Sequence, residues 1–363
     1  MKIAFIGQKG IPATYGGIEN FTEEVATRLA KKGHEVVVYC RPHYTKTFRK
    51  FQGVSLRKIK SIPTKHLDAL SHTFLSGIDS ALKHFDIINF QAIGPATLSF
   101  IPRLSNGTKI VNIIHALDWK RSKWGFWAKR LLRLAEYPSV KFPHKVLVIS
   151  SELKKHFEEK WKKEMISLPT GIEEPIFKEP NLIKKFGLEK DDFILYLGRL
   201  VPEKGCHYLV EAFQKIKTDK KLFIAGEGSF TDGYLEKLHK STNHKIIFGG
   251  FVEKEIMQEL YSNAYLYVLP SEVEGLPHSI LQALSYGLAA LVSDIPENKE
   301  AASNFGFYFK NKDVSELKEK LEFLLQNENL VKSQKEERER YVKTNFSWDK
   351  TVEVLEGVYQ KLC

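Results

Sequence analysis

Two cationic side chains, Arg199 and Lys204, stand five residues apart between glycines in the segment GRLVPEKG, residues 198–205. Such a pair can clamp a diphosphate, because arginine offers a planar fork of donors and lysine a mobile positive charge. A solvated basic turn is the alternative. The segment directly follows an apolar run at 193–198, and the carboxyl end of a strand is where α/β sheets bind ligands, so we favour a binding site.

A second polar segment, SEVEGLPHSILQAL at 271–284, also follows an apolar run and enters a helical pattern. Glu274 is expected on the loop, where its carboxylate can hold sugar hydroxyls, and the amides after Gly275 can face phosphate at the helix N-terminus. Gln282 is expected two turns into the helix. A solvent-facing turn is the alternative, but together with residues 198–205 this segment is predicted to form the second wall of one pocket.

A third segment, GQKGIPATYGGIEN at 7–20, is rich in glycine and joins the first apolar run to a helical pattern. Glycines let backbone amides approach an anionic ligand closely. The spacing differs from the dinucleotide fingerprint, and an ordinary strand–helix turn is the alternative.

One histidine, His115, ends the apolar run at 110–114, at a predicted carboxyl edge of the sheet. A lone histidine is more often structural, and Asp118 is its weaker companion. The following stretch, 119–133, interleaves tryptophans with lysines and arginines, as at a lipid headgroup interface. A solvated helix that packs its aromatic residues inward is the equally weighted alternative.

The elements that must position these residues alternate between apolar runs and helical patterns, which predicts an α/β architecture with parallel sheets. Helical spacing of Ile18, Phe21, Val25 and Leu29 gives a helix ended by Gly33. The predicted strands are 3–7, 35–40, 87–90, 110–114 and 146–150, followed by 193–198, 222–226, 246–251, 265–269 and 288–293. Helix breakers near 170–190 predict a joint between two domains, 1–172 and 173–345, followed by a last helix at 346–363.

Charge divides unevenly along the 363 residues, which carry a net charge of +11. Residues 1–180 contain 30 basic and 16 acidic side chains, whereas residues 181–363 contain 25 and 28. The first half should therefore face an anionic partner such as a membrane surface or a phosphorylated acceptor. Nucleic acid would also suit this charge, but no nucleic-acid-binding module is recognisable. Three widely spaced cysteines and no apolar run of about 20 residues predict a cytoplasmic protein, at most peripheral to a membrane.

GRLVPEKG followed by SEVEGLPHSILQALSYG resembles the donor site of the family-4 retaining glycosyltransferases, and the resemblance covers essentially the whole chain. It implies the GT-B fold, in which two Rossmann-like domains face each other across a cleft. FSWDKTVEVLEGVYQKL resembles that family's last helix, which crosses back to the first domain. GQKGIPATYGGIEN, KHLDALSHTFLS and HALDWKRSKWG resemble a bacterial subgroup that builds surface polysaccharides and includes rhamnosyltransferases.

The resemblance implies roles for individual residues. Those expected at the reacting centre are His115, Arg199, Lys204 and Glu274. Those expected to bind the nucleotide-sugar donor are Gly16, Gly17, Gly198, Gly226, Phe251, Val252, Gly275, Leu276, Pro277 and Gln282. Those expected at the saccharide or lipid-linked acceptor are Tyr15, Glu19, Asp118, Lys120 and Arg121.

Gln282 departs from the family, which has a glutamate there to grip the ribose hydroxyls. A neutral amide offers a weaker acceptor, which predicts either reduced donor affinity or a 2′-deoxyribose donor such as dTDP-rhamnose. The donor is thus a UDP- or dTDP-sugar. No metal or other cofactor is expected, because Arg199, Lys204 and helix amides can neutralise the leaving diphosphate.

Two mechanisms of retention stay open. Glu274 is the obvious carboxylate nucleophile for double displacement, but the resemblance makes it a sugar ligand and implies same-face attack. A nucleotide-sugar epimerase of the same fold and a non-catalytic binding module are alternatives. The first lacks an identifiable acid/base set, and Arg199, Lys204 and Glu274 argue against the second.

Overall fold

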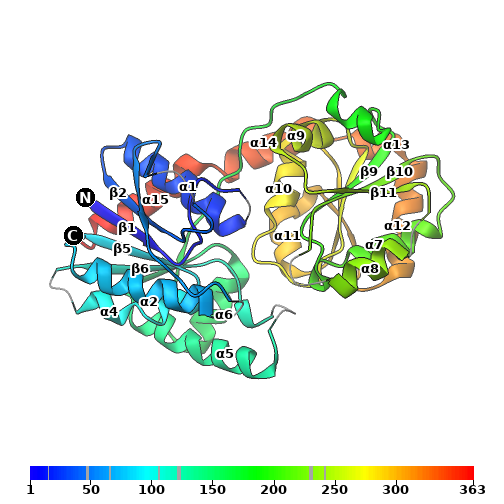
Figure 1. Cartoon of the computed structure of the whole chain (residues 1–363). Coiled ribbons are helices and arrows are strands. Elements are labelled where there is room, and N and C mark those ends of the chain that lie inside the picture. The colour runs from blue at the N-terminus through cyan, green and yellow to red at the C-terminus, as the bar shows by residue number, and fades with distance from the viewer. Residues whose placement is uncertain are drawn as a thin grey trace. The chain divides into compact units, whose positions relative to one another are not determined.

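The computed structural model describes residues 1–14, 16–45, 49–64, 67–104, 107–120, 124–228, 232–240 and 243–363 (Figure 1). Its contacts divide the chain into two compact units. Unit 1 consists of Met1–Gly171 with Phe346–Cys363, and unit 2 of Ile172–Asn345. The last helix therefore belongs to the unit that begins the chain.

Unit 1 is built on a sheet in the order β3-β4-β2-β1-β5-β6-β7-β8, parallel except for the β3–β4 pair. Its strands are β1 Lys2–Ile6, β2 Glu35–Cys40, β3 Lys50–Phe51, β4 Val54–Lys58, β5 Ile87–Gln91, β6 Lys109–Ile114, β7 Lys145–Val148 and β8 Ile166–Ser167. Its helices are α1 Gly17–Lys31, α2 Leu67–Ala81, α3 Ile93–Ala96, α4 Phe100–Arg103, η1 Asp118–Lys120, α5 Phe126–Lys141, α6 Ser151–Trp161 and α15 Trp348–Gln360. The order of strands reverses between β1 and β5, so this is the switch point at which such sheets bind ligands.

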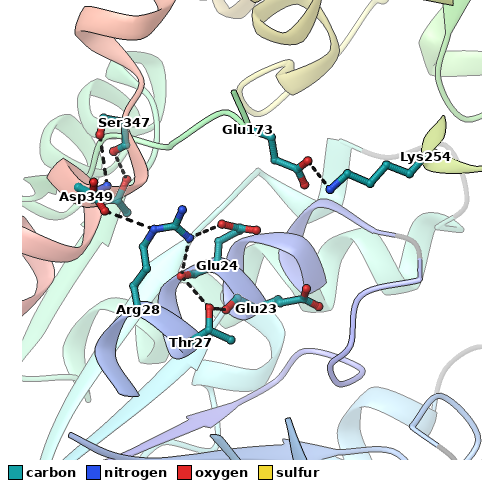
Figure 2. A network of polar contacts seen from close by, with 9 residues as sticks. Glu23, Glu24, Thr27, Arg28, Glu173, Lys254, Ser347 and Asp349 are labelled. Carbon is teal, nitrogen blue, oxygen red and sulfur yellow. Dashed lines mark hydrogen bonds and ion pairs between the residues drawn. The ribbon is translucent and has the colours of Figure 1, made fainter. Parts of the chain in front are cut away.

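Helix α15 docks on α1, on the face of the sheet opposite α2 and α5 (Figure 1). Trp348 is buried and its ring meets the edge of Phe21, with centroids 5.8 Å apart. Figure 2 shows Arg28 of α1 reaching Asp349 in the first turn of α15, where Nε lies 3.4 Å from the carboxylate. The first and last helices of the chain thus share one core.

Unit 2 is built on a parallel sheet in the order β11-β10-β9-β12-β13-β14. Its strands are β9 Phe193–Leu197, β10 Lys221–Ala225, β11 Ile246–Gly250, β12 Leu266–Leu269, β13 Ala290–Ser293 and β14 Gly306–Phe309. Its helices are η2 Leu182–Phe186, η3 Pro202–Lys204, α7 Cys206–Gln214, α8 Asp232–Lys240, α9 Lys254–Asn263, α10 His278–Ser285, α11 Pro296–Ala302, η4 Ser303–Phe305, α12 Val314–Gln326, α13 Glu328–Lys332 and α14 Lys335–Asn345. Here the switch point lies between β9 and β12.

A buried arginine ties α14 to the ends of two other helices of unit 2. Arg338 is 1% exposed, and its Nη1 donates to the carbonyl oxygens of Gly287 and Val331, each at 3.1 Å. These carbonyls follow α10 and end α13, so a positive charge lies where helix dipoles are negative. Burial lowers the pKa of Arg338 to about 10, which leaves it charged at neutral pH.

All ten predicted strands form, with ends that differ by at most two residues, and α1 ends before Gly33, as predicted. Four further strands of the described residues were not predicted: β3, β4, β8 and β14. The expected position of Gln282 was wrong, because α10 begins only at His278 and Gln282 lies just one turn into it.

Candidate functional site

The loops after β9 and β12 meet at the switch point of unit 2. Glu272 N donates to Glu203 O at 2.8 Å, which joins the two loops through their backbones. Gly205 has φ +67°, and a Cβ there would lie 1.9 Å from Pro270 O. Only glycine satisfies both the left-handed conformation and this close approach. The spacing of GRLVPEKG therefore serves to pack the cationic loop against its neighbour.

Lys204 and Glu274 lie in direct contact on these two loops. Lys204 Nζ is 2.5 Å from both Glu274 carboxylate oxygens. The side chains are 16% and 6% exposed, so little water screens the pair. Arg199 lies on the same loop as Lys204 and is exposed. Lys204 and Glu274 were predicted to have separate roles, and their ion pair was not predicted from the sequence.

His278 begins α10 directly behind this pair. The pKa of His278 is lowered to about 4 mainly by burial; the charge of Glu274 opposes this shift and that of Lys204 adds to it. The imidazole is therefore neutral at physiological pH. It lies in the helical turn that follows Gly275, Leu276 and Pro277, whose backbone leads into the N-terminus of α10.

The backbones of β9 and β10 touch where the two strands end. Gly226 has φ +135°, and a Cβ there would lie 1.9 Å from Gly198 O. Gly226 N donates to Gly250 O at 2.8 Å, so the end of β11 joins the same edge. Phe251 follows with a ring that is 58% exposed, and Val252 is half-buried. At this edge of the sheet the backbone carries no side chain at Gly198, Gly226 and Gly250, and the exposed ring of Phe251 lies next to it in the sequence.

Gln282 points its amide toward the segment that enters unit 2. Its Nε2 donates to Ser285 Oγ at 3.2 Å and to Glu173 O at 3.4 Å. The Glu173 carboxylate in turn lies 2.6 Å from Lys254 Nζ (Figure 2). A carboxylate at position 282 could not donate to either oxygen. These two hydrogen bonds are therefore a structural reason for glutamine at this position.

In unit 1, His115 lies just beyond β6, beside the switch point between β1 and β5. The residue is 8% exposed, and its Nε2 lies 2.6 Å from Gln91 Oε1 at the end of β5. Phe21 of α1 meets the imidazole edge-on, with centroids 4.9 Å apart. The ring is thus held from two sides at the carboxyl edge, where the sequence predicted it.

The glycine-rich loop is held by acidic residues of the helix that follows it. Glu19 Oε1 accepts from Lys9 N at 3.0 Å, and Glu23 Oε2 accepts from Ala13 N at 2.5 Å. Glu19 was assigned to the acceptor, yet its carboxylate folds back beneath Gly16, where an added Cβ would lie 2.0 Å from Oε2. Gly17 opens α1 with open space around its Cα.

Asp118 and Lys120 lie in the short helix η1, half-buried and exposed respectively. Trp119 between them donates its indole N–H to Glu136 Oε1 at 2.6 Å. Glu136 is fully buried on α5; burial would raise its pKa, but hydrogen bonds from His156, Lys160 and Trp119 hold it below the usual range. The hydrogen bond from Trp119 to Glu136 was not predicted from the sequence. Tyr15 and Arg121 lie outside the described residues.

Two helices on one face of unit 1 carry large apolar side chains into solvent. On α5, Phe126 and Trp127 are 71% and 73% exposed, so these two aromatic residues of the stretch 119–133 do not pack inward. The further exposed apolar residues of α5 and α2 are Leu131, Leu134, Tyr137, Leu67, Leu70, Phe74, Leu75 and Ile78. We call this set the apolar face. Within the part of the chain that is described, no helix is long and apolar enough to cross a bilayer.

Comparisons with known proteins cover both units. Residues 15–174 match the family described as Glycosyltransferase Family 4, and residues 178–345 match Glycosyl transferases group 1. An uncharacterized glycosyltransferase of Methanocaldococcus jannaschii is 26% identical over 325 residues, which is 81% of each chain.

One further relative and one solved structure are similar to this chain. The N,N′-diacetylbacillosaminyl-diphospho-undecaprenol α-1,3-N-acetylgalactosaminyltransferase of Campylobacter jejuni is 31% identical over 149 residues, 40% of this chain and 39% of that one. The solved structure of Anabaena HepE with UDP and glucose superimposes with a TM-score of 0.82 at 17% identity, covering 99% of this chain and all of the other. The two matched families together span nearly the whole chain, and solved glycosyltransferases share its architecture. The protein therefore belongs to the family-4 glycosyltransferases and has the two Rossmann-like domains of the GT-B fold.

Proposed function

We propose that this enzyme is a retaining glycosyltransferase. It moves a sugar from a UDP- or dTDP-sugar to a lipid-linked or saccharide acceptor in bacterial surface polysaccharide synthesis. The observation that carries the proposal is the contact between Lys204 and Glu274 at the switch point of unit 2, with Arg199 on the same loop.

A diphosphate suits this arrangement because it can replace Glu274 as the counter-ion of Lys204. Lys204 and Arg199 then neutralise the charge that develops on the leaving group, a task that amides after Gly275 can share. Cations that the protein supplies make a divalent metal unnecessary in this scheme. Glu274, once released, can accept hydroxyl groups of the transferred sugar.

The direct test incubates the purified chain with a panel of nucleotide sugars and an acceptor, and measures nucleotide release. The anomeric configuration of the product is read from the proton coupling of its new linkage. Retention with one preferred donor is the expected result. Inversion would refute the proposed stereochemistry, and release that requires an added metal would refute the role given to Lys204 and Arg199. A returned epimeric nucleotide sugar would instead identify an epimerase.

The preference for the nucleoside is proposed to depend on Gln282. Its Nε2 is occupied by Glu173 O and Ser285 Oγ, which leaves Oε1 as the acceptor for a ribose hydroxyl. One neutral acceptor suits a 2′-deoxyribose better than a ribose with two vicinal hydroxyls. Calorimetry should therefore find dTDP bound at least as tightly as UDP, whereas much tighter binding of UDP would exclude a dTDP-sugar.

A lipid-linked acceptor is supported by the apolar face. On α5, Lys129, Arg130 and Arg133 accompany Phe126 and Trp127, a combination that suits an anionic headgroup layer. The C. jejuni relative is named for an acceptor that is itself a polyprenyl diphosphate. We therefore propose that this face rests on the inner surface of the cell membrane.

Vesicle sedimentation tests the membrane contact. Trp127→Ser should weaken binding to phosphatidylglycerol vesicles about tenfold or more, since burying a large apolar side chain contributes about 2 kcal/mol. Phe323→Ser, at a half-exposed position in unit 2, is the matched control and should change nothing. Equal binding to neutral and anionic vesicles, or an unchanged Trp127→Ser variant, would contradict the proposal.

A further inference from the structure

A row of buried polar side chains runs through the core of unit 1 and ends at His115. Gln91 Nε2 donates to Asn89 Oδ1 at 3.3 Å, and Asn89 Nδ2 donates to the Tyr359 hydroxyl at 2.5 Å. His115 Nε2 lies 2.6 Å from Gln91 Oε1. The row therefore connects the last helix of the chain, α15, to the imidazole at the carboxyl edge of the sheet.

The row follows from the strand pattern. Asn89 and Gln91 are two residues apart on β5, so both side chains leave the same face of the sheet. Gln91 pairs with Ile113 of β6, which places His115 two residues beyond that pair. Tyr359 lies in the penultimate position of α15, which packs over this face.

The burial of this row calls for an explanation. Asn89, Gln91 and Tyr359 are each 0% exposed, whereas inner strands of parallel sheets are usually apolar throughout. Burying an amide is unfavourable unless its hydrogen bonds are satisfied, so two amides in one strand bring no advantage to packing alone. Each of the two amides here satisfies the next group in the row, and only His115 reaches the surface.

We infer that Tyr359, Asn89 and Gln91 are positioning residues that fix the ring tautomer of His115. A carbonyl oxygen can only accept, so Gln91 Oε1 holds the proton of His115 on Nε2. In this tautomer Nδ1 can only accept a hydrogen bond, and under the proposed function its donor is a hydroxyl of a bound sugar. Phe21 limits rotation of the ring, so the hydroxyl meets a fixed acceptor. Only this last step, the contact with the sugar, rests on the proposed function.

The test reads the tautomer directly, in the protein without substrate. Long-range proton–nitrogen NMR correlations of 15N-histidine-labelled protein, assigned with His115→Gln, distinguish a protonated ring nitrogen from an unprotonated one. We expect protonated Nε2 in the wild type. In Tyr359→Phe, which removes only the hydroxyl, both nitrogen shifts should move toward the average of the two tautomers.

Tyr265→Phe is the matched control. The Tyr265 hydroxyl donates to Leu324 O at 2.7 Å in unit 2, so this variant also loses one buried hydroxyl contact. It should leave the His115 nitrogens unchanged, although its thermal stability falls by a similar amount. Gln91→Leu, which removes the oxygen that accepts from Nε2, should abolish the preference that Gln91 imposes on the tautomer.

Kinetic measurements distinguish the effect of the row on the tautomer from the proposed role of His115 in transfer. We expect Tyr359→Phe to lower kcat about fivefold with a nearly unchanged donor KM, as the loss of one buried hydrogen bond suggests. A wild-type Nδ1–H tautomer, or His115 nitrogens indifferent to Tyr359→Phe, would overturn the inference. If the nitrogen chemical shifts of His115 change in Tyr359→Phe while kcat and KM stay normal, the row does fix the tautomer but His115 has no part in the proposed mechanism.

Discussion

Replacing Lys204 by alanine tests the reasoning about the site most directly. The change removes a charge that lies 2.5 Å from both oxygens of Glu274 and leaves a carboxylate that is only 6% exposed. Removing one member of a buried pair costs about 3–5 kcal/mol, and the partial exposure of Lys204 reduces this to about 2 kcal/mol here. The domain should therefore stay folded.

The effect on catalysis should be larger than the effect on stability. Loss of one charged donor to the leaving group is worth about 3 kcal/mol in the transition state, or roughly 150-fold in kcat. The assay is nucleotide release with the preferred donor, beside denaturant unfolding of the same samples. Lys215→Ala is the matched control, because Lys215 pairs with Glu211 on the exposed surface of α7 and should affect neither measurement.

A partner variant distinguishes a diphosphate clamp from a structural ion pair. Glu274→Gln removes the competing carboxylate, so binding of the free nucleoside diphosphate should become tighter while transfer falls. If Lys204→Ala turns over at near the wild-type rate, or if both variants weaken nucleotide binding equally, the exchange of counter-ions at Lys204 is refuted.

Three further changes have defined outcomes. Gln282→Glu should raise the affinity for UDP relative to dTDP, measured by calorimetry. It should also lower the free energy of unfolding by about 1 kcal/mol, because a donated hydrogen bond is lost. An unchanged ratio of the UDP and dTDP affinities would contradict the role given to Gln282. Burial lowers the pKa of His72 and of His278 to about 4, so the unfolded chain protonates first. As far as these two histidines determine it, the free energy of unfolding should be highest above pH 6.5. Each histidine should lower it by about 1.4 kcal/mol per pH unit between pH 6.5 and pH 4. Denaturant titrations of His72→Gln and of His278→Gln should each show a smaller slope than the wild type. Arg338→Met should destabilise unit 2 by about 3 kcal/mol, since two buried carbonyls lose their donor, whereas Arg340→Met on the exposed side of α14 should not.

Much of the fold was accessible from sequence, because buried parallel strands are continuous apolar runs and the apolar residues of α1 recur at helical spacing. The missed strands have a physical explanation. β3 and β8 are two residues long, and β4, which lies next to the edge strand β3, alternates apolar with polar residues. Gly306 opens β14, a weak strand former at a sheet edge. The missed strands thus lack the continuous apolar run on which the prediction depended.

The site was predictable in its loops but not in its pairings. Glycine and cation spacing located residues 198–205 and 271–284, and strand order then explains why the two loops meet. The contact of Lys204 with Glu274, the fold-back of Glu19 and the anchor of Trp119 on Glu136 depend on side-chain directions that no spacing specifies.

The same limit applies to the row that ends at Tyr359. Asn89 and Tyr359 are 270 positions apart, and neither stands in a motif. Two amides in an otherwise apolar strand, INFQ at 88–91, were the available signal, since a buried strand without a polar task has no reason to carry them. In β5 the two buried amides lead to His115 at the carboxyl edge of the sheet, so α15 completes unit 1 chemically as well as by packing.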